Sequence, residues 1–373
     1  MKCVFITGNI DINYGGGIVT FRNLKFLEEF GIEVIKIFLV KDKKKYLNSK
    51  YNIYIQGSKN KIDTFLNSVK LYIGNLSSKA EKEVIKEIKK NKIDFIFYDG
   101  SYYGRVIKKI KKYNSNIKHI TFFHNVEQNF TKALIEKDGI KYISIYFASI
   151  FNEYLSVKYS DILITLNEIE SNELKKIYGR KADYILPISL EDKFNETKII
   201  DRKEKKLKLL FIGSYFFANY YGIKWFIENV MNNIINAKLY IVGKGFENKK
   251  LELESKNVEV IGSCNDIEKF YYDSDIIVSP IFSGAGMKVK IAEALMYGKT
   301  ILGTSKAFEG YEIEDFNKIG GLCDTKEEYI EKINFFFNYK NFKRLNDYSR
   351  KIFLEKYSNN SIRNIMKNII KNI

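Results

Sequence analysis

The order of elements along the chain constrains its fold most. Short apolar runs rich in β-branched residues are each followed by a glycine and then by a segment with helical apolar spacing, first at residues 3–31 and again at residues 207–231. Buried-type strands that alternate with helices are typical of parallel sheets covered on both faces. We therefore predict an α/β protein built from doubly wound parallel sheets.

The length of the chain predicts two domains, because 373 residues exceed one ordinary hydrophobic core. Residues 188–206 are polar and lysine-rich and form the best linker candidate. We expect a first domain at residues 1–187 and a second at residues 207–345. Residues 346–373 are expected to form a carboxyl-terminal helix that could pack back on the first domain.

The net charge of +17 favours an anionic partner: nucleic acid, an anionic membrane or a phosphorylated substrate. No nucleic-acid-binding signature is present, so nucleic acid is not expected as a partner. No transmembrane run or signal peptide is seen, and the three cysteines lack metal-ligand spacing. We expect a cytoplasmic protein without a metal site, peripheral on the inner face of the membrane. The aromatic helix at residues 140–159 could contact lipid or could be core.

Residues 279–299 read as a strand end, a glycine loop and a helix. Gly284 and Gly286 allow the backbone to turn tightly and approach a ligand, and the helix is expected from about Met287 to a stop at Gly298. The amides at the start of this helix would favour an anion. The stretch thus predicts a site for a phosphorylated ligand.

Gly286, Lys290 and Glu293 follow i, i+4, i+7 spacing and are expected on one helix face. An ammonium near a phosphate and a carboxylate near vicinal hydroxyls could hold a nucleotide by its phosphates and ribose. Lys288 lies on another face and ranks below Lys290. The alternative is that Lys290 and Glu293 form only a solvated i, i+3 pair.

Two further features lie in the first half. A strand at residues 118–123 delivers His124 to its carboxyl end, where open α/β sheets bind ligands; the alternative is a satisfied loop histidine. The glycines at 15–17 are consecutive and come too late after the first strand for a dinucleotide fingerprint. We interpret them as a loop that approaches a substrate and do not expect NAD.

Taken together, the chain resembles the two-domain nucleotide-sugar glycosyltransferases of the GT-B fold, in the retaining branch of glycosyltransferase family 4 (group 1). The resemblance rests on four segments in this order: residues 211–214, 241–245, 279–294 and 304–310. It implies two Rossmann-like domains facing across a cleft and transfer of a sugar from a nucleotide diphosphate sugar, with UDP or GDP. The acceptor would be a glycan, a lipid-linked molecule or a protein, and no metal or other cofactor is implied.

The resemblance also implies roles for individual residues. Glu293 would bind the ribose and Lys290 the pyrophosphate, while His124 matches a histidine near the transferred sugar; these three are the catalytic candidates. The implied nucleotide-sugar-binding set comprises Gly16, Gly17, Gly213, Ser214, Gly243, Lys244, Gly284, Ala285, Gly286, Met287, Lys288, Lys290 and Glu293.

The chain departs from its relatives in one carboxylate. Many relatives carry a pair of glutamates flanking the glycine loop, and here the first position falls on Ser283 or Gly284. Glu309 is expected to lie elsewhere, and Lys224 is offset from a basic position that relatives use. Two alternatives therefore stay open: a sugar-nucleotide epimerase or hydrolase of the same fold, or a non-catalytic partner subunit of a transferase.

Overall fold

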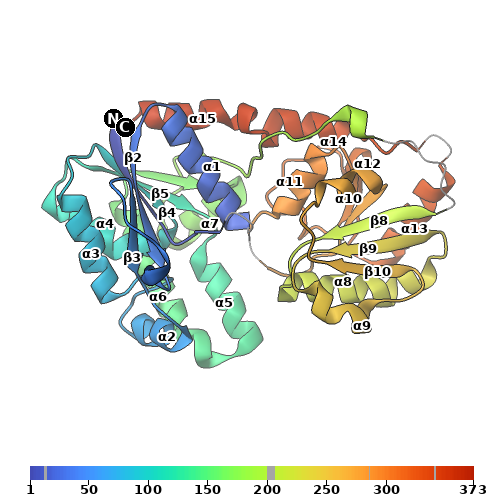
Figure 1. Ribbon diagram of the computed structural model, residues 1–373, viewed down its shortest axis with the longest axis horizontal. Helices are drawn as coiled ribbons and strands as arrows, with labels where there is room; N and C mark the ends of the chain where they lie inside the picture. Colours follow the sequence, from blue (N-terminus) through green and yellow to red (C-terminus); the bar gives the residue numbers. More distant parts are fainter. Residues whose placement is uncertain (12–14, 200–205, 285, 340–341) are drawn as a thin grey trace. The chain divides into compact units, whose positions relative to one another are not determined.

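The computed structural model describes residues 1–11, 15–199, 206–284, 286–339 and 342–373, with the backbone alone at 137–138. These residues form two compact units (Figure 1). Unit 1 comprises Met1–Pro187 and Ile362–Ile373, and unit 2 comprises Ile188–Ser361. Each unit has its own sheet and its own helices and is described by itself.

Unit 1 contains a seven-stranded parallel sheet of order β3-β2-β1-β4-β5-β6-β7. The strands are β1 (Lys2–Thr7), β2 (Glu33–Val40), β3 (Asn52–Gln56), β4 (Phe95–Asp99), β5 (Lys118–Phe123), β6 (Ile162–Thr165) and β7 (Tyr184–Ile185). The helices are α1 (Gly15–Glu29), α2 (Lys61–Val69), α3 (Ser78–Lys89), α4 (Gly104–Tyr113), α5 (Glu127–Asp138), α6 (Ile143–Tyr159), α7 (Glu168–Tyr178) and α15 (Asn359–Lys371). Helix α15 lies beside α1, where Arg363 forms an ion pair with Glu29 (Figure 1).

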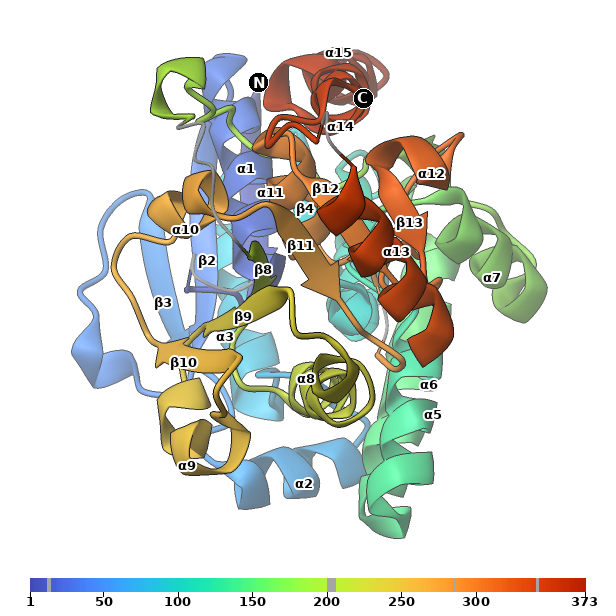
Figure 2. The same ribbon diagram turned by 90° about the vertical axis from the view of Figure 1, so that its right-hand side faces the viewer.

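Unit 2 contains a six-stranded parallel sheet of order β10-β9-β8-β11-β12-β13. The strands are β8 (Leu207–Ile212), β9 (Ala237–Val242), β10 (Val258–Gly262), β11 (Ile276–Ser279), β12 (Thr300–Gly303) and β13 (Gly320–Leu322). The helices are α8 (Phe217–Asn229), α9 (Lys250–Leu253), α10 (Glu268–Asp273), α11 (Val289–Met296), α12 (Phe316–Ile319), α13 (Lys326–Asn338) and α14 (Asp347–Ile352). Figure 2 shows α8 and α13 along this sheet.

The burial of the central strands explains why they could be predicted from the sequence. β4 and β11 are buried along their whole length, as expected for strands of a parallel sheet covered on both faces. Strand order reverses beside β1 in unit 1 and beside β8 in unit 2. In open α/β sheets, ligands bind at the carboxyl ends of strands next to such a reversal. The predicted α/β fold with doubly wound parallel sheets is confirmed.

Three local predictions need correction. The glycines at 15–17 form the first turn of α1 and are not a loop, because glycine also adopts helical angles and Thr20 Oγ1 bonds back to the carbonyl of Gly16 at 2.9 Å. The basic and polar sequence of residues 41–75 predicts a poorly patterned, partly exposed insertion, whereas the structure forms β3 and α2 there. The carboxyl-terminal helix expected over residues 346–373 is divided into α14, a π-helical turn at Phe353–Tyr357 and α15.

Candidate functional site

The glycine loop of unit 2 joins β11 to α11. Gly284 and Gly286 have φ of 106° and 72°, a region that glycine enters without strain. Helix α11 begins at Val289, two residues later than expected, so Gly286 lies in the loop and does not share the helix face. Gly298 follows α11 with φ of 57°, which confirms the predicted glycine stop. Ala285 lies outside the described residues.

Lys290 lies in the first turn of α11 and points toward β8. Its Nζ donates to Asn219 Oδ1 at 2.8 Å and sits 4.2 Å from the centre of the Phe211 ring. Burial lowers the pKa of Lys290 to about 7, against the opposing effect of Glu293. The neutral amine form of Lys290 can therefore gain a proton when an anion binds beside it.

Glu293 lies one turn further along α11 and has a different partner. Tyr271 donates its hydroxyl to Glu293 Oε2 at 2.9 Å, and the Tyr271 ring stacks on Tyr297 with centroids 4.6 Å apart. Burial raises the pKa of Glu293 although Tyr271 and Lys290 oppose the rise. Within the described part of the chain Lys290 and Glu293 make no ion pair, so the interpretation as a solvated pair is not supported.

Two glycines let backbone segments meet beside Lys290. A Cβ on Gly243 would lie 1.9 Å from the carbonyl oxygen of Gly213, and a Cβ on Gly213 would lie 2.8 Å from Lys290 Nζ. Asn219 fixes this corner, since its Nδ2 donates to the carbonyl of Ser214 at 2.8 Å while its Oδ1 accepts from Lys290. The structure thus brings together Gly213, Ser214, Gly243 and Lys290 from the predicted set.

The start of α11 is braced from the segment after β12. Tyr311 donates its hydroxyl to the carbonyl of Lys288 at 2.7 Å and accepts from the amide of Ala292 at 3.2 Å. Lys288 bonds to the carbonyl of Gly286 and lies 3.8 Å from a carboxylate oxygen of Glu309. Glu309 is therefore beside the loop, contrary to expectation, because the carboxyl ends of neighbouring parallel strands share one edge of the sheet.

The remaining predicted residues of unit 2 differ in exposure. Met287 is buried, whereas Lys244 is exposed and contributes its carbonyl to the amide of Tyr215 at 2.8 Å. No side chain caps the N-terminus of α11, and the amides of Ile291 and Ala292 already bond to the Lys288 carbonyl and the Tyr311 hydroxyl, so the donors left for a ligand come before them. The loop and helix start can therefore present backbone donors to an anion.

In unit 1, His124 follows β5 and meets a carboxylate from the next strand. His124 Nε2 lies 2.8 Å from Oδ1 of Asp99, the last residue of β4. Asp99 Oδ2 accepts from Thr7 Oγ1 at 2.7 Å and from Thr20 Oγ1 at 2.6 Å. Burial alone would raise the pKa of Asp99, but His124 and the two hydroxyls outweigh burial and lower it. Asp99 is thus a buried carboxylate kept ionised.

A second acidic cluster supports the segment after His124. Glu153 on α6 accepts from the backbone amides of Glu127 at 2.9 Å and Gln128 at 3.2 Å, at the start of α5. Tyr178 also donates to Glu153, at 2.8 Å. Burial, followed by the charge of Glu127, raises the pKa of Glu153 to about 7. This carboxylate anchors the helix start next to His124.

The sequence reasoning missed three side chains that position the predicted ones: Asp99, Asn219 and Tyr271. Only Asp99 carried a signal in the sequence. Asp99 is the last residue of a buried strand, and His124 directly follows another. The carboxyl ends of adjacent parallel strands lie close together, so the two side chains could have been expected to meet. Asn219 and Tyr271 lie 71 and 22 residues from their partners and have no local pattern.

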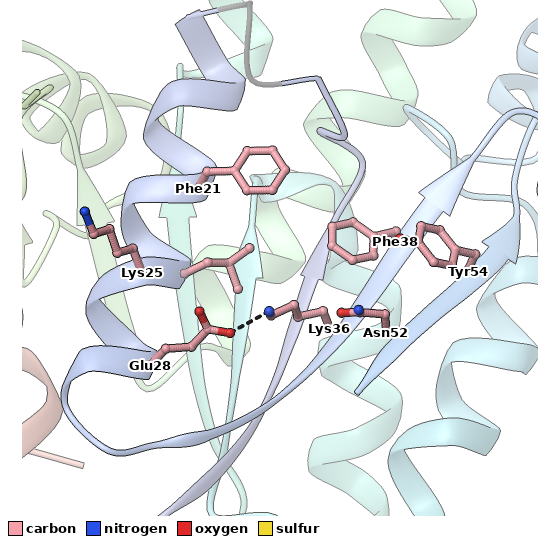
Figure 3. A pocket seen from close by; sticks show the side chains of 8 residues that line it. Phe21, Lys25, Glu28, Lys36, Phe38, Asn52 and Tyr54 are labelled. Atoms are coloured by element: carbon pink, nitrogen blue, oxygen red, sulfur yellow. Dashed lines mark ion pairs between the residues drawn. The ribbon is translucent and has the colours of Figure 1, made fainter. Parts of the chain in front are cut away.

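A cavity of about 410 Å³ in unit 1 lies between α1 and strands β2 and β3 (Figure 3). Phe21, Phe38 and Tyr54 line it, and Lys36 forms an ion pair with Glu28 at 2.5 Å on its wall. None of the predicted site residues lines this cavity.

The residues that the structure describes contain neither a candidate metal cluster nor a helix that could span a membrane. No group of three or more His, Cys, Asp or Glu side chains is placed to hold a metal ion. No helix among them has the length and apolar character needed to span a membrane.

Comparison with known proteins identifies the second unit. Residues 206–337 match the model of the family described as Glycosyl transferases group 1. A Klebsiella pneumoniae relative, described as an uncharacterized 44.6 kDa protein in the cps region, is 23% identical over 330 residues, covering 80% of this chain and 81% of its own.

Solved structures match along the whole chain. Sucrose-phosphate synthase from Thermosynechococcus elongatus superposes with a TM-score of 0.73 at 13% identity, covering 100% of this chain and 98% of its own. Anabaena HepE in complex with UDP and glucose gives a TM-score of 0.69 at 11% identity, with 100% of both chains covered. The chain therefore has the GT-B fold of these structures, and residues 206–337 of its second unit resemble the glycosyl transferases of group 1.

Proposed function

We propose that this enzyme transfers a sugar from a nucleotide diphosphate sugar to a glycan, lipid-linked or protein acceptor, with retention of anomeric configuration and without a metal ion. The observation that carries the proposal is the placement of Lys290. Its ammonium is held by Asn219 beside the backbone of Gly213, at the start of the helix that follows the glycine loop. An ammonium beside backbone amides in this position supports a diphosphate as the ligand.

The proposed reaction requires stabilisation of the nucleotide diphosphate as it leaves. As the sugar leaves through an oxocarbenium-like state, negative charge grows on the phosphate. Lys290, the first amides of α11 and the loop before it would stabilise that charge. Glu293, one turn further along and held by Tyr271, would accept hydrogen bonds from the ribose hydroxyls.

His124 would act on the sugar side of the reaction. Because ionised Asp99 can only accept, the proton between the two residues belongs to His124 Nε2. This bond orients the imidazole, and the other ring nitrogen is the atom that would meet the transferred sugar. Thr7 and Thr20 keep Asp99 in place and ionised.

UDP and GDP are the donor nucleotides we propose, and UDP is favoured by the UDP and glucose in the HepE complex. The cps-region relative supports a role in polysaccharide biosynthesis. We further propose a cytoplasmic enzyme that contacts the inner face of an anionic membrane, which the net charge of +17 supports.

Thermal-shift titration with UDP, GDP, ADP and CMP tests donor binding. At about 100 times its dissociation constant, a nucleotide should stabilise the wild type by roughly 2.7 kcal/mol. Glu293→Gln should respond much less, whereas Glu327→Gln, on the exposed face of α13, should respond like the wild type. If no nucleotide shifts the wild type, the transferase proposal fails and a non-catalytic partner subunit becomes the better interpretation.

Product analysis separates transfer from hydrolysis. With the nucleotide that binds and its labelled sugar donors, the enzyme should release free sugar slowly without an acceptor. Fast release or epimerisation without an acceptor would instead identify a hydrolase or epimerase of the same fold. The anomeric configuration of the transferred sugar, read by NMR, checks retention, and undiminished turnover in EDTA checks metal independence.

A further inference from the structure

Helix α2 has its amphipathic pattern turned outward. Its apolar residues Ile62, Phe65, Leu66 and Val69 follow i, i+3, i+4, i+7 spacing and form one stripe. These four side chains are between 48% and 70% exposed, while the helix's one buried residue is Ser68, at 1%. A surface helix of a soluble domain normally buries its apolar stripe, so this exposed stripe calls for a partner.

The polar side of α2 is fixed against unit 1 by hydrogen bonds. Ser68 Oγ lies 2.7 Å from Ser144 Oγ of α6, and Asn67 Nδ2 donates to Ser58 Oγ at 3.0 Å. Asn60 caps the helix by accepting from the amide of Asp63 at 2.9 Å. The outward orientation of the stripe is therefore specified by the structure and is not a loose attachment.

Helix α6 packs against α2 and also carries exposed apolar residues (Figures 1 and 2). Ile143 and Phe147 of α6 are 47% and 56% exposed, and Ile140, just before the helix, is 80% exposed. We call the four α2 residues together with these three the α2–α6 surface.

Lysines border this surface. On the helical wheel, Lys61 lies next to Phe65 on one side of the stripe and Lys70 lies next to Leu66 on the other. Both lysines are exposed, as are Lys59 and Lys141. Residues 41–70 carry eight lysines against two aspartates. An apolar stripe flanked by lysines on both sides matches a helix that lies in the interface of an anionic bilayer.

We propose that the α2–α6 surface docks unit 1 on an anionic lipid surface, with the apolar stripe of α2 at the acyl boundary and the flanking lysines at lipid phosphates. The inference rests on the membrane contact in the proposed function and names the residues that make it. A second copy of the chain is a poorer occupant, because a two-fold interface places the same patch, lysines included, against itself. Each side of the stripe has an ammonium that lipid phosphate would neutralise.

Vesicle flotation of the full chain tests the proposal. The probes are vesicles of phosphatidylcholine alone and of phosphatidylcholine with about one-third phosphatidylglycerol. We expect the wild type to float with the anionic vesicles and at least tenfold less with the neutral ones. Phe65→Ser with Leu66→Ser should reduce flotation at least tenfold, and Lys61→Gln with Lys70→Gln should reduce it on anionic vesicles.

The matched control is Ile235→Ser with Leu251→Ser, which removes two exposed apolar side chains of unit 2 and should leave flotation unchanged. Wild-type flotation by the α2 variant would overturn the proposal, and so would a dimer in solution that the α2 variant converts to a monomer. The nucleotide thermal shift is measured on every variant. A variant that keeps the nucleotide-induced thermal shift but no longer floats supports docking through this surface. If no nucleotide shifts the wild type, the transferase proposal fails, and the flotation result still decides the docking proposal by itself.

Discussion

Binding of a nucleoside diphosphate should cause Lys290 to take up a proton. In the free protein burial lowers the pKa of Lys290 to about 7, so near neutral pH about half of the molecules carry an uncharged amine. Two phosphates beside Nζ would favour the ammonium and return its pKa toward the ordinary range of lysine. The uptake is specific to the diphosphate role that we propose for this residue.

The magnitude follows from linkage. If only the ammonium form binds well, the association constant is divided by about 2 at pH 7, about 11 at pH 8 and about 100 at pH 9, relative to full protonation. Affinity should therefore fall about fifty-fold between pH 7 and pH 9, or about 2.3 kcal/mol. The second ionisation of a phosphate, near pH 6, is complete over most of this range and does not produce the fall.

Isothermal titration calorimetry at pH 8, in two buffers with different ionisation enthalpies, measures the uptake directly. We expect about 0.9 proton per bound nucleotide in the wild type. Lys290→Met should bind weakly and without uptake, while Lys256→Met, which removes an exposed lysine with no predicted role in binding, should retain the uptake. A flat affinity between pH 7 and pH 9 with no proton uptake would show that Lys290 is already charged in the free protein, and the reasoning from burial would be wrong.

Three further changes are expected to have measurable effects on stability in urea unfolding. Glu153→Gln should reduce the pH dependence of the free energy of unfolding. The pKa of Glu153 is raised to about 7 in the folded protein, so the folded state holds a proton that the unfolded state has lost above about pH 4.5. The wild type should therefore lose on the order of 3 kcal/mol of stability between pH 4.5 and 7, and the variant should not. Equal slopes for wild type and variant would contradict this. Gly243→Ala should destabilise unit 2 by at least about 2 kcal/mol, since its Cβ would meet the Gly213 carbonyl at 1.9 Å; an unchanged midpoint would refute the close approach. Asp99→Asn should lower the free energy of unfolding at pH 7 by about 2 kcal/mol. The pKa of Asp99 is lowered in the folded protein, so only its ionised form stabilises the fold. The difference between variant and wild type should therefore shrink as pH falls below the ordinary aspartate pKa. A difference that persists at pH 2 would assign the loss to packing.

The central strands of both sheets could be predicted because their signal is local. A strand buried on both faces is a continuous apolar run, and β4 and β11 are such runs. β3 could not be predicted, because it is an edge strand of only five residues with polar residues on both sides. Its position in the sheet depends on its pairing with β2. Helix α2 has a clear helical period, but it was missed among the basic and polar residues that surround it.

The candidate site divides in the same way. Lys290 and Glu293 could be placed on one helix because the helical period depends only on spacing. Their orientations are set by Asn219 and Tyr271, which come from other elements of unit 2 and leave no trace in the local pattern. The start of α11 was predicted two residues early for a related reason: the loop is held by Tyr311, which lies beyond the next strand.

The assignment of α15 has a consequence for how the chain is made. Unit 1 needs Ile362, Met366 and Ile369, which are buried in it, yet the ribosome produces all of unit 2 before it reaches them. At typical rates of synthesis this interval is roughly ten to forty seconds. During it, the first 187 residues wait with one helix missing while unit 2, a continuous segment, can fold. We therefore expect nascent unit 1 to engage chaperones, and a nonsense mutation at Ile362 to leave unit 2 complete and unit 1 incomplete.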